Sequence, residues 1–122
     1  MHLTCTDLTK NYNNKIVVDK ISLDLEAKKV IGLLGPNGAG KTTTFYMLVG
    51  LIKCNSGKIQ INDDDITELP MHLRSDLGIS YLPQEPSIFR NLNVKDNILA
   101  ILQTRKDLSS KDQLSKLDYL VN

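Results

Sequence analysis

Apolar and polar residues alternate in the N-terminal part of the chain, a pattern typical of strands with one buried face. One alternation is formed by Leu3, Cys5 and Leu8, and another by Ile21, Leu23 and Leu25. Residues 10–15 between them are polar and include three asparagines, which indicates a turn. Residues 58–62 alternate again after the Asn-Ser-Gly sequence at 55–57 and predict another strand.

Two further segments are predicted as strands. Residues 30–34, Val-Ile-Gly-Leu-Leu, are apolar on both faces, as expected for a central strand of a sheet covered on both sides. Residues 78–82 predict a strand that ends at Pro83.

Four segments are predicted as helices. Residues 41–51 follow a glycine-rich loop, and residues 70–77 carry a proline near their first turn. Residues 94–102 have apolar side chains on one side, namely Val94, Ile98, Ile101 and Leu102. Ser-Ser-Lys-Asp at 109–112 resembles a capping box and opens a last helix with the stripe Leu114, Leu117 and Leu120. The order of strands and helices predicts a mixed α/β fold.

Composition narrows the classes of function. The 122 residues carry 15 basic and 14 acidic side chains, a formal charge of +1, and no tryptophan. General nucleic-acid binding is therefore not expected. Cys5 and Cys54 are expected as reduced thiols. No apolar run approaches the roughly 20 residues of a membrane helix, and no signal peptide is recognised. We expect a cytosolic protein that can still dock on a membrane protein.

The strongest chemical signal is a match to the phosphate-binding pattern GxxxxGK[ST]. Its residues are Gly35, Pro36, Asn37, Gly38, Ala39, Gly40, Lys41 and Thr42. The glycines allow successive backbone N–H groups to turn inward around phosphate oxygens, and the following helix directs its positive end at them. Lys41 supplies an ammonium for the β- and γ-phosphates, and the Thr42 hydroxyl is the expected Mg²⁺ ligand. The sequence therefore predicts binding of a nucleotide triphosphate, ATP with Mg²⁺.

Several other residues have two interpretations when considered alone. Tyr12, in a polar loop between strands, is either an adenine-stacking ring or an ordinary surface tyrosine. Gln84 follows a predicted strand, where α/β sheets hold ligand groups, or it is a solvated loop residue. The three aspartates at 63–65 favour a solvated turn over a metal site. His2 and His72 are isolated and favour surface positions.

Taken together, these residues resemble ATP-binding subunits of ABC transporters. The resemblance is carried by Tyr12, the 35–42 loop with the threonines at 43 and 44, and the Leu-Pro-Gln segment at 82–84. The resemblance implies a P-loop NTPase core with an antiparallel β subdomain. It implies that Tyr12 stacks on adenine, that residues 35–42 and Thr43 hold the nucleotide, and that Thr42 and Gln84 contact the metal. Lys41 and Gln84 are the implied catalytic residues.

Longer runs are more particular. The chain is similar to the ATPases of lipopolysaccharide export in Gram-negative bacteria in four segments, residues 32–47, 63–66, 69–70 and 78–90. The most specific runs are Thr-Thr-Thr-Phe-Tyr-Met in the first segment and Pro-Ser-Ile-Phe-Arg in the last. The resemblance implies a homodimer of ATPase subunits on transmembrane permease subunits, at the cytoplasmic face of the inner membrane. It also implies that the segment after Gln84 receives a short helix of the permease. Phe89 and Arg90 are the predicted contacts, whereas Ile98 and Leu102 are expected in the core.

The matched region, residues 1–122, corresponds to the N-terminal part of a single ATP-binding domain. It contains no Leu-Ser-Gly-Gly signature and no apolar strand ending in Asp-Glu, which would supply a second magnesium carboxylate and the general base. Phosphoryl transfer needs a positioned water and charge neutralisation together. Two functions stay open: part of an ATP-hydrolysing transporter subunit, and a nucleotide-binding module without catalysis. A GTPase lacks support because no Asn-Lys-x-Asp motif is present.

Overall fold

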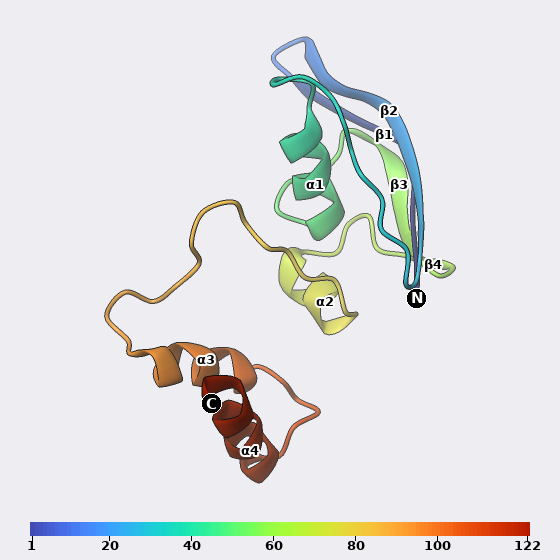
Figure 1. Cartoon of the computed structure of the whole chain (residues 1–122). Helices are drawn as coiled ribbons and strands as arrows, with labels where there is room; N and C mark the ends of the chain where they lie inside the picture. Colours follow the sequence, from blue (N-terminus) through green and yellow to red (C-terminus); the bar gives the residue numbers. More distant parts are fainter. The chain divides into compact units, whose positions relative to one another are not determined.

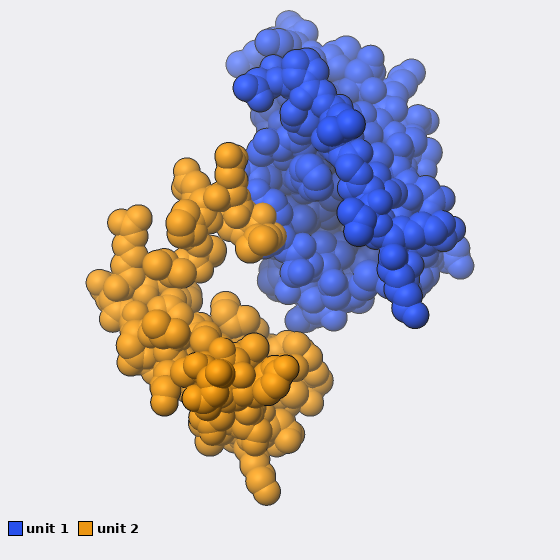
Figure 2. All heavy atoms as spheres, viewed as in Figure 1, with its two compact units in different colours: residues 1–81 blue, residues 82–122 orange.

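The structure is a computed structural model that describes all residues from 1 to 122. They form two compact units, residues 1–81 and residues 82–122 (Figure 2). In chain order, the first unit contains β1 (His2–Tyr12), β2 (Lys15–Glu26), α1 (Lys41–Val49), β3 (Ser56–Ile61), β4 (Asp64–Asp65) and α2 (Met71–Asp76). The second contains α3 (Val94–Leu102) and α4 (Ser110–Val121).

The first unit is built on a four-stranded antiparallel sheet in the order β2-β1-β3-β4 (Figure 1). Strands β1 and β2 form a long hairpin in which Tyr12 lies opposite Lys15. Its two-residue turn consists of Asn13 and Asn14, both with positive φ, the geometry of a type I′ turn. Asparagine tolerates this backbone conformation, which explains why the chain turns here. The turn is shorter than the predicted 10–15, because residues 10–12, Tyr12 included, continue β1 and Lys15 begins β2.

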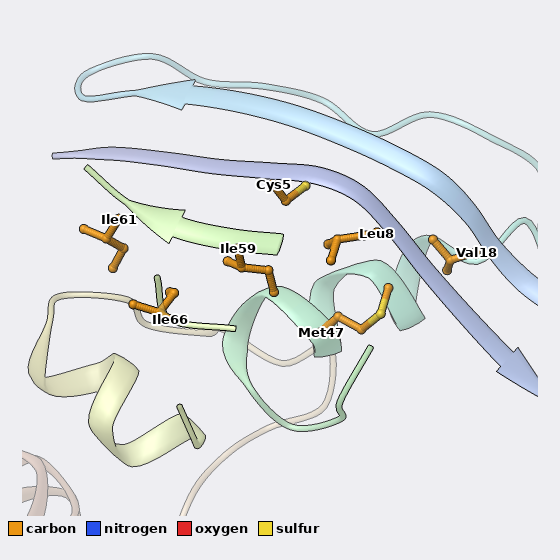
Figure 3. Packing of buried hydrophobic residues seen from close by; sticks show 7 residues of the cluster. All are labelled: Cys5, Leu8, Val18, Met47, Ile59, Ile61 and Ile66. Atoms are coloured by element: carbon orange, nitrogen blue, oxygen red, sulfur yellow. The ribbon is translucent and has the colours of Figure 1, made fainter. Parts of the chain in front are cut away.

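One face of this sheet packs on α1, and the core lies between them (Figure 3). The alternating side chains predicted to be buried on β1 include Cys5 and Leu8, which share one core cluster with Met47 of α1. The cluster as a whole consists of Cys5, Leu8, Val18, Met47, Ile59, Ile61 and Ile66. Burial raises the pKa of the Cys5 thiol, and both cysteines are free.

The C-terminal end of α1 is held by a buried arginine. Arg74 of α2 is only 2% exposed and donates hydrogen bonds to the carbonyl oxygens of Met47 and Leu48, at 2.7 and 2.8 Å. Two more bonds reach the carbonyl oxygens of Thr67 at 2.8 Å and Leu69 at 2.7 Å. Burial lowers the pKa of this guanidinium, but four acceptors compensate for its loss of water. Arg74 thereby joins α1, α2 and the segment between β4 and α2.

Two predicted strands are absent. Residues 30–34 and 78–82 form no ladder with any other segment, and Val30 and Leu34 are 99% and 94% exposed. A strand that is apolar on both faces becomes regular only when neighbours pair with its backbone and cover its sides. Neither segment finds such a neighbour here, so both remain irregular although their composition favours strands.

The second unit is a pair of packed helices with well-formed N-termini. The Asn93 side chain accepts a hydrogen bond from the Asp96 N–H at the start of α3. The predicted capping box at α4 is confirmed, because the Ser109 and Asp112 side chains each accept from the other's backbone N–H. The bounds of α3 agree with the predicted 94–102, and Leu102 is buried as expected. None of the helices in either unit has the length and apolar character needed to cross a membrane.

Candidate functional site

The glycine-rich loop between β2 and α1 adopts a turned backbone that requires glycine. Gly38 and Gly40 have φ values of +83° and +89°, in the left-handed region. Ala39, which lies between these two glycines, donates its N–H to the Pro36 carbonyl oxygen at 3.2 Å, and this bond closes a tight turn. Glycine is the residue that adopts such angles without steric cost, so the spacing of the motif is matched by the conformation of the loop.

Gly40 is also the point at which the loop meets the sheet. It directly precedes α1 and is buried against β2, where a Cβ atom would lie 2.4 Å from the Val17 carbonyl oxygen. Thr44, which is fully buried, donates from both its N–H and its hydroxyl to the Gly40 carbonyl oxygen, each at 2.9 Å. These contacts fix the N-terminal end of α1 on β2 and direct its first turn toward the loop.

The functional side chains of the motif lie on that first turn. Lys41 is partly exposed and its ammonium donates a hydrogen bond back to the Gly35 carbonyl oxygen at the start of the loop. Thr42 is exposed and Thr43 is partly exposed, and the first turn contains no acidic residue. The loop is therefore bordered by a cation, a hydroxyl and the positive end of a helix, an arrangement suited to an anion. The residues predicted at 35–43 are thus brought together.

Tyr12 lies at the same end of the sheet as the loop. It is the last residue of β1, next to the β1–β2 turn. Two residues earlier, Lys10 pairs with Val18 of β2, which follows Val17, the residue closest to Gly40. The Tyr12 side chain is 47% exposed, and the Lys10 ammonium lies 5.1 Å from the ring centroid. An exposed ring in this position fits a stacking role.

Gln84, Phe89 and Arg90 belong to the second unit, and all three are exposed. Phe89 is held by Asn97, whose side chain accepts from the Phe89 N–H at 2.7 Å and donates to its carbonyl oxygen at 3.0 Å. The ring, 58% exposed, borders an apolar depression formed within this unit by Ile88, Ile98, Ile101, Leu102 and Leu120. The roles predicted for these three residues stay predictions.

The remaining candidate residues, the aspartates at 63–65 and His2, lie in turn and surface positions. Asp63 lies in the turn between β3 and β4, and Asp65 accepts from the Thr67 N–H and hydroxyl at 2.9 and 2.6 Å. The chain brings no group of three or more His, Cys, Asp or Glu side chains together as a metal site. His2 lies on the surface, 2.6 Å from the Asp24 carboxylate.

Sequence reasoning missed three supporting residues. Lys10 could have been found from its two-residue spacing from Tyr12, because such residues share one face of a strand. Thr44 was visible as the third threonine of a helix that begins at the loop, but its bond to Gly40 was not. Arg74 gave no signal, since a lone arginine on a short helix is normally a surface residue.

A sequence model of the family described as ABC transporter matches residues 18–121. The chain is 52% identical over 119 residues to the lipopolysaccharide export system ATP-binding protein LptB of Haemophilus influenzae, and 51% identical over 119 residues to LptB of Escherichia coli. Each alignment covers 98% of this chain and 49% of the relative. The chain therefore spans about half the length of these curated relatives.

Solved structures agree with the sequence matches. An ATP-binding cassette of an ABC transporter in its ADP conformation matches with a TM-score of 0.76 and 25% identity, over 95% of this chain and 46% of that chain. An ATP binding subunit of an ABC transporter matches with a TM-score of 0.75 and 26% identity, over 91% and 45% of the two chains. These likenesses confirm the predicted fold class and the resemblance drawn from the motifs.

Proposed function

Because the chain belongs to the ABC transporter family, we propose that it binds ATP with Mg²⁺ on the loop at 35–43. The observation that carries the proposal is the conformation of this loop. Gly38 and Gly40 take left-handed angles, and the loop ends on a helix whose first turn carries Lys41 and Thr42. A loop of this geometry turns N–H groups, an ammonium and a helix N-terminus toward one anion. Triphosphate is the ligand whose charge and size suit that set.

The residues also fit magnesium. This ion prefers hard oxygen ligands and keeps several of its waters, so it is held by few protein groups together with phosphate oxygens. Thr42 offers an exposed hydroxyl beside Lys41. By its resemblance to ABC transporter subunits, Gln84 is proposed as a further magnesium ligand of the intact protein. Bound Mg²⁺ would supply neutralisation of phosphate charge, while Lys41 would orient the terminal phosphates through its ammonium.

Tyr12 is proposed to stack on the adenine ring. A planar ring that is half exposed offers apolar contact and π-stacking to a base. Its position at the hairpin end, close along the sheet to the point where Gly40 meets β2, supports a base bound beside the phosphates.

Isothermal titration of ATP–Mg²⁺ into the chain tests the proposal. Lys41→Ala should weaken binding about tenfold or more, because a charge-assisted hydrogen bond is worth about 1.5–3 kcal/mol. Lys58→Ala is the matched control, since Lys58 is an exposed lysine of β3 whose ammonium lies 3.9 Å from Asp65. Equal dissociation constants for the wild type and Lys41→Ala would contradict the proposed contact between Lys41 and the phosphates. Tyr12→Ala should also weaken ATP, whereas Tyr12→Phe and Tyr12→Trp should retain it.

We further propose that the ATP site serves a transporter subunit that hydrolyses ATP and powers lipopolysaccharide export. The identity of about one half to the LptB proteins over nearly the whole chain supports this substrate over those of other ABC importers and exporters. The subunit would act as a homodimer on transmembrane permease subunits at the cytoplasmic face of the inner membrane. A chimera of Haemophilus influenzae LptB, with its matching half replaced by this chain, should restore growth of cells depleted of LptB; failure of a stably expressed chimera argues for another substrate.

The alternative is a nucleotide-binding module without turnover. Lys41 and Gln84 are the catalytic contributions proposed for these 122 residues, and no general base is recognised among them. We therefore expect the 122-residue chain to bind ATP–Mg²⁺ with no ATPase activity above background. Steady turnover that disappears in Lys41→Ala would contradict this expectation and make Glu85, beside Gln84, the first residue to test as a base.

A further inference from the structure

Lys10 and Tyr12 occupy one face of β1 near the β1–β2 turn. Residues two apart in a strand project to the same side, so the lysine stem runs beside the ring. Its Nζ lies 5.1 Å from the centroid of the Tyr12 ring, within the range of a cation–π interaction. One face of the ring is therefore taken by an ammonium, while 47% of the side chain remains exposed.

The Lys10 ammonium is fixed by a second contact. It donates a 2.6 Å hydrogen bond to the carbonyl oxygen of Lys53, in the segment between α1 and β3. That segment is attached to β1 on both sides of Lys10: the Asn55 N–H donates to the Thr9 carbonyl oxygen at 2.8 Å, and the Asn55 side chain accepts from the Asn11 N–H at 2.8 Å. The acceptor of Lys10 thus belongs to a segment joined to the same strand.

The neighbouring lysine does not compete for the ring. The side chain of Lys53 pairs with Glu68 at 2.9 Å, and this hydrogen bond raises the pKa of Lys53. Lys15, which lies opposite Tyr12 on β2, is not the lysine whose ammonium lies over the ring. A single anchored cation therefore defines which face of Tyr12 is covered.

We propose that Lys10 is a positioning residue of the adenine site, which holds one face of the Tyr12 ring and leaves the other for the base. The inference rests on the proposed stacking role of Tyr12. An exposed aromatic ring that is free to change rotamer loses this freedom when a ligand stacks on it, and the loss reduces affinity. A ring already held between its strand and an anchored ammonium avoids part of that cost.

The experiment compares two ligands, ATP–Mg²⁺ and inorganic tripolyphosphate with Mg²⁺, by titration calorimetry on the 122-residue chain. Lys10→Met should weaken ATP about two- to fivefold, the range expected from an exposed cation–π contact, and leave tripolyphosphate nearly unchanged. Lys10→Arg should restore ATP, because it returns both the cation and the donor. Lys10→Gln keeps a hydrogen-bond donor for the Lys53 carbonyl oxygen but removes the charge, so it separates the effect of the cation from that of the hydrogen bond. It also replaces Lys10→Met in the test if Lys10→Met folds poorly.

Lys15→Met is the matched control, since it removes the same charge from the same end of the hairpin. If it lowers ATP affinity as much as Lys10→Met, the effect is general electrostatics and the inference is overturned. The inference is also overturned if Lys10→Met and Lys10→Gln both keep the wild-type ratio of ATP affinity to tripolyphosphate affinity. If Tyr12→Ala lowers that ratio in the same experiment, the proposed adenine site itself still stands. If Tyr12→Ala too keeps the ratio, the stacking role itself is wrong, and Lys10 has no base to position.

Discussion

Gly40 approaches β2 so closely that a Cβ atom at this position would lie 2.4 Å from the carbonyl oxygen of Val17. The same residue has a φ of +89°, precedes the first turn of α1 and accepts two hydrogen bonds from Thr44. The requirement for glycine at this point of the motif therefore has two origins in this chain, one in the backbone angle and one in the contact with the sheet.

Gly40→Ala should lower the free energy of unfolding by about 2–4 kcal/mol, because the left-handed angle and the contact with Val17 both oppose a side chain. Gly38→Ala is a matched variant with a φ of +83° but open space around its Cβ position, so it should lose only the angular part, about 1–2 kcal/mol. Gly32→Ala, with open space and no positive φ, should change little. Urea denaturation measures all three, and equal losses at Gly40 and Gly38 would show that the contact with Val17 is readily relieved.

The four hydrogen bonds of Arg74 lead to a second prediction. Arg74→Met removes the donor shared by four carbonyl oxygens and should lower the free energy of unfolding by about 2–4 kcal/mol. Each buried acceptor left without a partner costs about 1–3 kcal/mol, and the Met47 carbonyl oxygen keeps only a 3.3 Å bond from the Gly50 N–H. Arg74→Lys should recover part of this loss, because one ammonium cannot reach all four acceptors. Arg105→Met removes an exposed arginine that pairs with Asp107 and should have little effect in the same urea titration. Equal stability of Arg74→Met and Arg105→Met would contradict the role assigned to Arg74.

Acid should weaken the first unit through Asp65. Hydrogen bonds from the Thr67 hydroxyl and N–H lower the pKa of this carboxyl below its ordinary value. Its folded pKa is depressed, so its contribution is present above the unfolded pKa, about 3.9, and is lost as the pH falls through the folded pKa. Between pH 6 and pH 3 the wild type should therefore lose more stability than Asp65→Asn, which keeps an acceptor oxygen but does not titrate.

Asp63→Asn is the control for this measurement, because it removes the same charge two residues away, in the turn between β3 and β4, and leaves the bonds between Asp65 and Thr67 in place. Asp107, whose pKa is lowered to about 2 by its hydrogen bond with Arg105, is present in all three proteins and cancels in the comparison. Thermal melts at several pH values supply the data. If Asp63→Asn flattens the pH dependence as much as Asp65→Asn does, the effect arises from net charge and not from the bonds with Thr67.

The sequence was sufficient where structure depends on nearby residues. The turned loop ending at Gly40, the capping box of Ser109 with Asp112 and the bounds of α3 all follow from residue types a few positions apart. The segments 30–34 and 78–82 were predicted as strands and are irregular, because a strand depends on partners that a local pattern does not contain. The burial of Arg74 has the same origin: its acceptors come from α1 and from a separate segment, so only the folded chain brings them to one guanidinium.

Phe89 carries the last prediction, which concerns docking. Its backbone is fixed by Asn97, while its ring is mostly exposed at the edge of the apolar depression of the second unit. An apolar depression suits the apolar face of an amphipathic helix, and the exposed Arg90, next to Phe89 in the sequence, offers a charge for its polar face. When the intact protein is expressed with the proposed permease subunits, Phe89→Ala should reduce co-purification with them and leave ATP affinity nearly unchanged. The melting temperature should also change little, because the ring contributes little buried area.

Asn97→Ala provides the contrast that separates docking from folding. It removes the side chain that holds the Phe89 backbone and also donates to the carbonyl oxygens of Leu92 and Asn93, so it should lower the melting temperature of the second unit. Assembly lost in Phe89→Ala at a normal melting temperature therefore indicates a direct contact with the permease. If Phe89→Ala instead melts several degrees lower and still co-purifies normally, the ring belongs to the core of its own unit, and the docking role of Phe89 is wrong.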